Sequence, residues 1–100
     1  MSDTPFNGLT PAQAERLAML AEEAGEIVQM VGKILRHGYD SYHPNDRSVT
    51  NRQLLYRELR DLRGVMLLMH EASDMDTNMS YDEMNGAAKK KLRYAHHQDG

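Results

Sequence analysis

Residues 10–38, TPAQAERLAMLAEEAGEIVQMVGKILRHG, decide the fold. Apolar side chains recur in this stretch every three or four residues and form one arc on a helical wheel. The arc comprises Leu17, Leu20, Ala21, Ala24, Ile27, Val28, Val31, Ile34 and Leu35. Thr10 and Gln13 have the spacing of a capping box, which marks a helix start. We therefore predict an amphipathic helix from Pro11 to His37, with Gly38 as a left-handed stop.

The same opening chemistry predicts two further helices. Thr50-Asn51-Arg52-Gln53 and Ser80-Tyr81-Asp82-Glu83 each place a hydroxyl residue three positions before Gln or Glu. We expect a second long helix from Asn51 to about Ser73 and a short third helix from Tyr81 to about Tyr94. No segment alternates with period two, so no strand is expected, and residues 39–49 are interpreted as a loop. The predicted fold class is all-α.

Composition limits what this chain can be. It has 100 residues, 12 basic and 15 acidic side chains, no Cys and 40% hydrophobic residues. We predict one domain, residues 1–100, with flexible ends at 1–9 and 98–100. The lack of Cys excludes disulfides and zinc–thiolate sites, and the acidic balance disfavours a nucleic-acid polymer as partner. No membrane span or signal-peptide core is visible, so a cytoplasmic protein without membrane contact is expected. The limited apolar content favours an oligomer.

Both long helices carry two carboxylates three residues apart. In the second helix, Glu58 falls inside the apolar arc and Asp61 borders it. The arc comprises Leu54, Leu55, Leu59, Leu62, Val65, Met66, Leu68 and Met69. In the first helix, Glu23 lies at the edge of the arc and Glu26 beside it. A carboxylate in an apolar stripe is costly unless it is paired, protonated or bound to a metal. The two pairs together would offer four oxygen ligands of the kind that Mg²⁺ prefers.

A structural interpretation of these carboxylates stands beside the metal site. Glutamates three residues apart on a helix are usually solvated surface features. These acids could instead form ion pairs with Arg57, Arg60 or Arg63 of a neighbouring subunit, because those arginines lie on the face of the second helix opposite Glu58. The sequence pattern alone favours neither the metal site nor the structural ion-pair cluster. A ferritin-like metal carrier is disfavoured, because no Glu has His three residues later.

At these residues the sequence resembles the MazG-type all-α nucleoside triphosphate pyrophosphohydrolases. Their hallmark, E-E-x-x-E followed after a spacer by E-x-x-D, is matched by residues 22–26 and 58–61. Lys33-Ile-Leu-Arg-His-Gly38 adds to the likeness, and Lys91-Leu-Arg-Tyr-Ala-His-His-Gln98 is similar to the tail of small phage-encoded members. The spacer of 31 residues is slightly long, and Arg60 stands where the family more often has Gly.

The resemblance implies a fold, a reaction and a cofactor. The fold is a bundle of two long helices and a short third, completed by oligomerisation as a dimer or tetramer. The reaction converts a nucleoside triphosphate, with a purine such as dGTP as a candidate, into the monophosphate and pyrophosphate. Mg²⁺, for which Mn²⁺ can substitute, is held by Glu23, Glu26, Glu58 and Asp61, and Glu22 or one of these ligands orients the attacking water. A phage-encoded enzyme would work in the host cytoplasm. The alternative is a non-catalytic helical interaction module.

Further residues are candidates for binding the substrate, each with a structural alternative. Lys33 could bind a phosphate or lie along the protein surface. Arg36 could also bind a phosphate, or it could complement the helix dipole. Asn51 could contact the nucleotide or merely begin the second helix. In the tail, Tyr94 and the histidines could stack on a base or pack the C-terminus. The candidate set is Lys33, Arg36, Asn51, Lys91, Tyr94 and His97.

Overall fold

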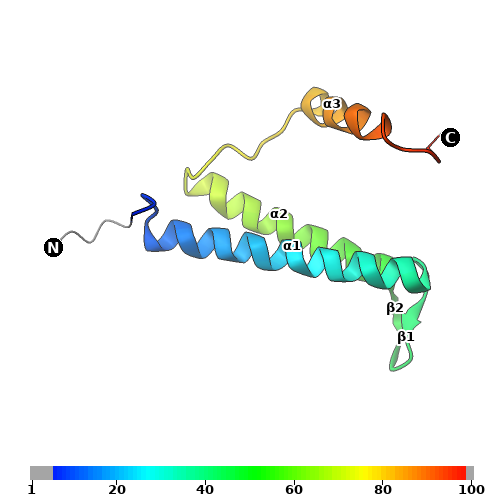
Figure 1. The fold of residues 1–100 in the computed structure, drawn as a ribbon. Coiled ribbons are helices and arrows are strands. Elements are labelled where there is room, and N and C mark those ends of the chain that lie inside the picture. Colours follow the sequence, from blue (N-terminus) through cyan, green and yellow to red (C-terminus); the bar gives the residue numbers. More distant parts are fainter. Residues whose placement is uncertain (1–5, 99–100) are drawn as a thin grey trace.

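The computed structural model describes residues 6–98, which are mostly helical (Figure 1). The elements follow in the order α1 (Pro11–His37), β1 (Tyr42–His43), β2 (Asp46–Thr50), α2 (Asn51–Glu71) and α3 (Tyr81–Leu92). All three helices begin at the predicted residue, each with a complete capping box. The expected flexible ends fall partly on residues 1–5 and 99–100, which lie outside the described residues. No helix of the described part has the length and apolarity needed to cross a bilayer.

The expectation of no strand is wrong for residues 42–50. β1 and β2 form a two-stranded antiparallel hairpin, in which Tyr42 pairs with Thr50 and His43 with Asp46. The register is irregular between the two residues of β1. So short and bulged a hairpin leaves no period-two alternation in the sequence, which explains why the pattern does not reveal it.

The hairpin end of the molecule fixes the turn from α1 into α2. Gly38 ends α1 with φ 89° and donates its N–H to Ile34. Asn51 is 7% exposed, and its side-chain amide donates to the Gly38 carbonyl at 3.2 Å. Its backbone N–H donates to the carbonyl of Ser41 at 2.9 Å. Because the first N–H groups of a helix have no partner within it, these bonds tie α2 to the preceding chain.

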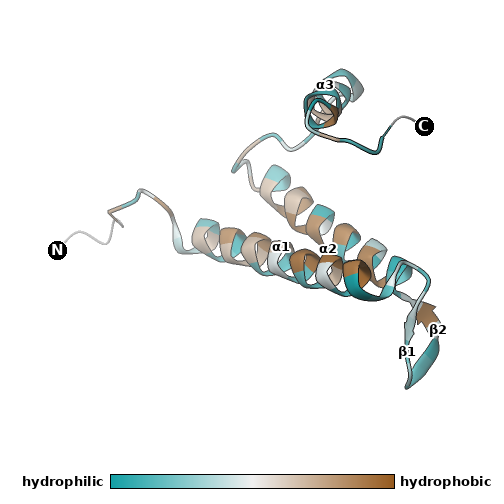
Figure 2. Ribbon diagram, turned by 45° about the vertical axis from the view of Figure 1, so that its right-hand side comes forward, coloured by the Kyte–Doolittle hydropathy of each residue, from teal (hydrophilic) through white to brown (hydrophobic). Residues whose placement is uncertain are grey.

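An ion pair joins α1 to the chain after α2 at the opposite end. Arg16 donates to both carboxylate oxygens of Asp74, through Nε at 2.5 Å and Nη2 at 2.9 Å. The side chains are 21% and 12% exposed, and the hydrogen bond from Arg16 lowers the pKa of Asp74. α1 and α2 therefore pack antiparallel and are joined at both ends (Figures 1 and 2).

Helix α3 stands apart from the α1–α2 pair (Figure 1). The segment leading to it first follows α2, where Thr77 donates its hydroxyl to the Met66 carbonyl at 3.1 Å. α3 itself has no buried residue. A helix of 12 residues gains most of its stability from packing, and within the described residues α3 finds little.

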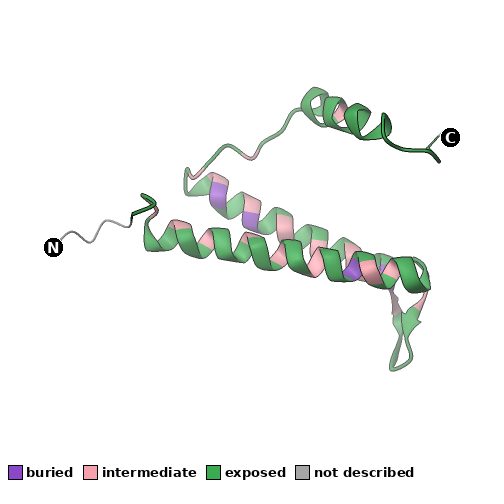
Figure 3. Ribbon diagram, viewed as in Figure 1, coloured by how far each residue is buried: buried purple, intermediate pink, exposed green. Residues whose placement is uncertain are grey.

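The described chain has a small hydrophobic core. Its buried apolar residues are Met30, Val65 and Met69, all between α1 and α2 (Figure 3). The wheel prediction is corrected here: Met30, which lies just beyond the predicted arc, is buried, whereas Val28 and Leu35 within it are 70% and 82% exposed. α1 contacts only one long helix, so α2 covers one edge of a wide apolar arc and leaves the other edge bare.

The core assignment predicts a contrast between two methionines. Met69→Ala removes a side chain that is 4% exposed and should lower the free energy of unfolding by about 2 kcal/mol or more. Met79→Ala removes the same atoms from a residue that is 52% exposed and should change stability by less than about 0.5 kcal/mol. Urea denaturation measures both, and equal losses would contradict the assigned core.

Candidate metal centre

Three carboxylates from two helices converge in the middle of the α1–α2 contact. Glu23 and Glu26 lie one turn apart on α1, and Glu58 lies on the buried face of α2. One oxygen from each residue lies within 4.8 Å of the others, and all three residues are half-buried. The i, i+3 spacing puts the two α1 carboxylates on one helix face, and antiparallel packing brings Glu58 opposite them. The structure thus brings together three of the four predicted ligands.

The carboxylates raise one another's affinity for a proton. The pKa of Glu58 is raised to about 7, first by a hydrogen bond shared with Glu26, then by burial and by the charges of Glu26, Glu23 and Asp61. The pKa of Glu23 is also raised, chiefly by burial and then by the charge of Glu26. The fully ionised cluster is therefore unstable at neutral pH without a compensating cation or proton.

Two oxygen atoms of the cluster are buried without a hydrogen-bond donor. They are Oε2 of Glu23 and Oε2 of Glu58. Among the described residues, no arginine or lysine forms an ion pair with either glutamate. Buried carboxylate oxygens ordinarily have partners, and oxygen ligands grouped in this way fit a hard divalent cation that keeps several of its waters. The donor set therefore fits Mg²⁺ or Mn²⁺.

The remaining acidic candidates lie at the margin of the cluster. Asp61 accepts hydrogen bonds from its neighbour Arg60, through Nη2 at 3.0 Å and Nε at 3.2 Å, and its side chain is 44% exposed. Its charge nevertheless contributes to the raised pKa of Glu58 and Glu23, so it lies near both. Glu22 is exposed on α1, and its charge acts on the adjacent Glu23. Neither residue joins the three converging oxygens in this conformation.

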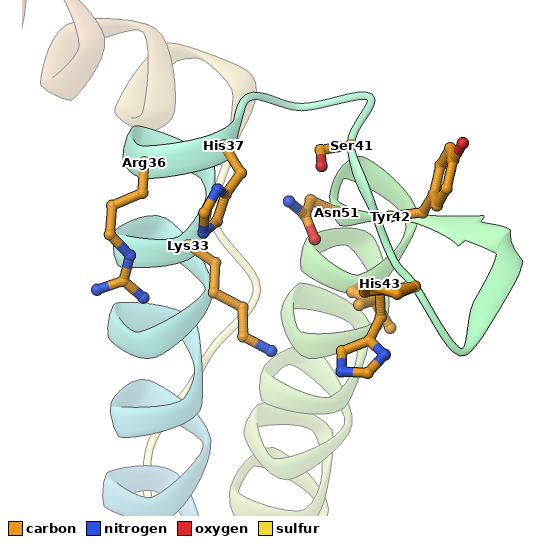
Figure 4. A pocket seen from close by; sticks show the side chains of 9 residues that line it. Lys33, Arg36, His37, Ser41, Tyr42, His43 and Asn51 are labelled. Atoms are coloured by element: carbon orange, nitrogen blue, oxygen red, sulfur yellow. The ribbon is translucent and has the colours of Figure 1, made fainter.

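The structure divides the predicted substrate residues into two groups. Lys33, Arg36 and Asn51 line one pocket of about 340 Å³ between the end of α1, the hairpin and the start of α2 (Figure 4). The other group does not reach this pocket. It lies on α3 and in the chain after it, and consists of Lys91, Tyr94 and His97.

Sequence reasoning missed part of this pocket. Ser41, Tyr42 and His43 form its hairpin wall, and His37 lies on the α1 side (Figure 4). The hairpin residues were missed because residues 39–49 were interpreted as a loop. Their only signal in the sequence is a cluster of aromatic and imidazole side chains within an otherwise loop-like segment, and the only signal for His37 is its place at the end of the first helix.

Comparisons with known proteins add no identification. No protein-family model matches the chain, and no curated protein or solved structure matches it significantly. The features of this chain that bear on its function are therefore the carboxylate cluster, the pocket and the resemblance of the motifs.

The raised pKa of Glu58 predicts a pH dependence of stability. Its pKa is about 7 in the folded chain against 4.5 for an ordinary glutamate, so its contribution is fully present below 4.5 and is lost as the pH rises through 7. Metal-free protein in EDTA should therefore become more stable between pH 8 and pH 5.

Two variants isolate that dependence. Glu58→Gln should flatten the slope of unfolding free energy between pH 5 and pH 8, because glutamine does not titrate. Glu71→Gln, at an exposed position of the same helix, should leave it unchanged. Equal slopes in the wild type and in Glu58→Gln would contradict the raised pKa of Glu58 and its proximity to Glu23 and Glu26.

Proposed function

We propose that this protein is a Mg²⁺-dependent nucleoside triphosphate pyrophosphohydrolase of the MazG-like kind. It would convert a (d)NTP, with a purine such as dGTP as a candidate, and water into the (d)NMP and pyrophosphate. The observation that carries the proposal is the convergence of Glu23, Glu26 and Glu58, with two buried oxygens that lack donors. The spacing of these residues within the E-E-x-x-E and E-x-x-D motifs connects them with this reaction.

The chemistry assigns a role to each group of residues. Mg²⁺, when bound, neutralises the polyphosphate and lowers the pKa of a coordinated water. Glu23, Glu26 and Glu58 would hold the cation, and Asp61, which pairs with Arg60 in this structure, would be its fourth ligand. Glu22, which is exposed beside Glu23, would accept the proton of the attacking water. Lys33 and Arg36 meet the phosphates from the pocket side.

We infer that the working form is a homo-oligomer, a dimer or tetramer. The chain exposes 8477 Å², about 2,700 Å² more than a compact monomer of its mass. Its radius of gyration is 17.8 Å, against about 13 Å for a compact domain of 100 residues. An excess of that size is enough for a stable subunit interface.

A second copy has a defined surface on which to pack. Leu17, Val28, Val31 and Leu35 are all exposed, and a helical repeat of 3.6 residues places them within about 60° of one another on α1. Small exposed residues lie along the same side, including Ala21 and Ala24.

An enzyme that acts on free nucleotides would work in the cytoplasm, which is the host cytoplasm if a phage encodes it.

One observation favours the alternative, a non-catalytic interaction module with structural acidic clusters. Asp61 is already paired with Arg60, as a structural ion pair would be. Glu23 and Glu58 have no such partner within the described chain, which is why the enzyme is the preferred proposal.

A pyrophosphate-release assay tests the enzyme directly. Purified protein with Mg²⁺ should release pyrophosphate from at least one (d)NTP of a panel. Glu58→Ala should lower the rate by about 10² or more, since it removes a ligand of the metal, whereas Glu71→Ala should not. Absence of pyrophosphate from every nucleotide would reject the enzyme, and full activity of Glu58→Ala would remove Glu58 from its site.

The oligomer predicts a distinct result in light scattering. The wild-type chain should have the mass of a dimer or tetramer. Val28→Asp places a charge in the exposed apolar stripe and should shift the mass toward the monomer. Gln29→Asp adds the same charge at the next, polar position and should not. A monomeric wild type would contradict the oligomer.

A further inference from the structure

The pocket between α1 and the hairpin has an unusual charge for an acidic protein. The chain carries a formal charge of −3, yet the nine lining residues include no carboxylate. Two of them are permanent cations, Lys33 and Arg36, and two are imidazoles, His37 and His43. A concave site lined by cations without acids favours an anionic ligand.

The permanent cations of the pocket are not neutralised by the chain itself. Among residues 6–98, neither Lys33 nor Arg36 takes part in an ion pair. The nearby acids of the hairpin region, Asp40 and Asp46, do not line the pocket. Asp40 accepts from Arg52 at 3.3 Å, and Asp46, whose charge acts on His43 and Arg57, accepts from the Ser48 hydroxyl at 2.5 Å. The positive charge of the pocket is thus available to a ligand.

A hydrogen bond within the hairpin orients the imidazole ring of His43. His43 Nδ1 accepts the backbone N–H of Asn45 at 3.1 Å. The proton of the neutral ring therefore resides on Nε2, which is left to donate to a ligand. Figure 4 shows the Lys33 side chain reaching from α1 toward α2 and the His43 ring on the hairpin side of the same space. The two donors thus come from opposite walls.

The pocket lies beside the carboxylate cluster along the same helix pair. Lys33 follows Glu26 by seven residues on α1, and Asn51 precedes Glu58 by seven on α2. At 1.5 Å per residue, about 10 Å of helix separates the two sites on each side. A nucleotide that is held at the carboxylates through one phosphate of its chain directs another phosphate toward Lys33 and the pocket.

We propose that this pocket binds a phosphate group, held between Lys33 of α1 and the Nε2–H of His43 on the hairpin. The ligand class is a small phosphorylated molecule, and His43 is the hairpin's contribution to recognising it. The assignment of that molecule to the nucleotide of the same reaction rests on the proposed function, whereas the binding of phosphate does not. The hairpin thereby has a purpose beyond joining two helices.

Metal-free NMR titration tests this site independently of catalysis. The full chain in EDTA is titrated with pyrophosphate, with dGMP and, at matched ionic strength, with sodium chloride. Pyrophosphate should give saturable amide shifts confined to residues 33–43 and the first turn of α2. Tighter binding of dGMP than of pyrophosphate assigns the pocket to the nucleotide, and the reverse assigns it to the pyrophosphate product.

Matched variants decide whether these donors carry the binding. Lys33→Ala and His43→Ala should each raise Kd about tenfold, which corresponds to about 1.4 kcal/mol. His43→Gln keeps an N–H donor and should recover part of the affinity. Lys90→Ala and His96→Ala, exposed outside the pocket, should change Kd by less than about twofold. Unchanged amide shifts along α1 and α2 confirm that each variant is folded.

Two results would overturn the site. One is the absence of saturable shifts at the pocket with either phosphate ligand. The other is an equal loss of affinity in Lys33→Ala and Lys90→Ala, which would mean diffuse attraction to surface charge. The titration needs neither Mg²⁺ nor turnover, so its result is independent of the pyrophosphate-release assay. An inactive protein that binds phosphate in the pocket would reject only the enzyme, and an active protein that does not bind phosphate there would reject only the pocket site.

Discussion

The convergence of Glu58 with Glu23 and Glu26 in the middle of the α1–α2 contact is the constraint on which the rest of the structure depends. A helix pair normally fills that place with an apolar side chain. Here a carboxylate faces Glu23 and Glu26, and its pKa is raised to about 7 by their proximity and by burial. The contact can be held in this form only if other interactions fix the two helices, or if a cation or proton compensates the charge.

The interactions that fix the helices lie at the two ends of the pair. At one end, Asn51 bonds to the Gly38 carbonyl and closes the turn through the hairpin; at the other, Arg16 pairs with Asp74. Between them lie three buried apolar residues, Met30, Val65 and Met69. So small a core, together with an exposed apolar stripe on α1 and a detached α3, leaves apolar surface that a second copy would cover in the proposed oligomer.

Local rules predicted most of the fold, and what they missed has physical causes. Capping boxes at Thr10, Thr50 and Ser80 place every helix start, because these bonds form within four residues. The convergence of Glu23, Glu26 and Glu58 also follows from their place on two helix faces. Burial could not be predicted as well, since it depends on which edge of the apolar arc meets α2. The hairpin and His43 were not predicted because β1 has two residues and β2 has one apolar side chain, Val49, so neither strand shows a period-two alternation. The pairing of Asp61 with Arg60 depends on side-chain rotation.

The most direct test of a metal centre in this helix pair is a crystal structure with Mn²⁺, read from its anomalous scattering. We expect one or more peaks between Glu23, Glu26 and Glu58, with carboxylate oxygens about 2.0–2.3 Å from the ion, and Asp61 turned away from Arg60 toward it. Anomalous peaks elsewhere, or no anomalous peak at the three carboxylates at saturating Mn²⁺, would contradict a metal centre at this position.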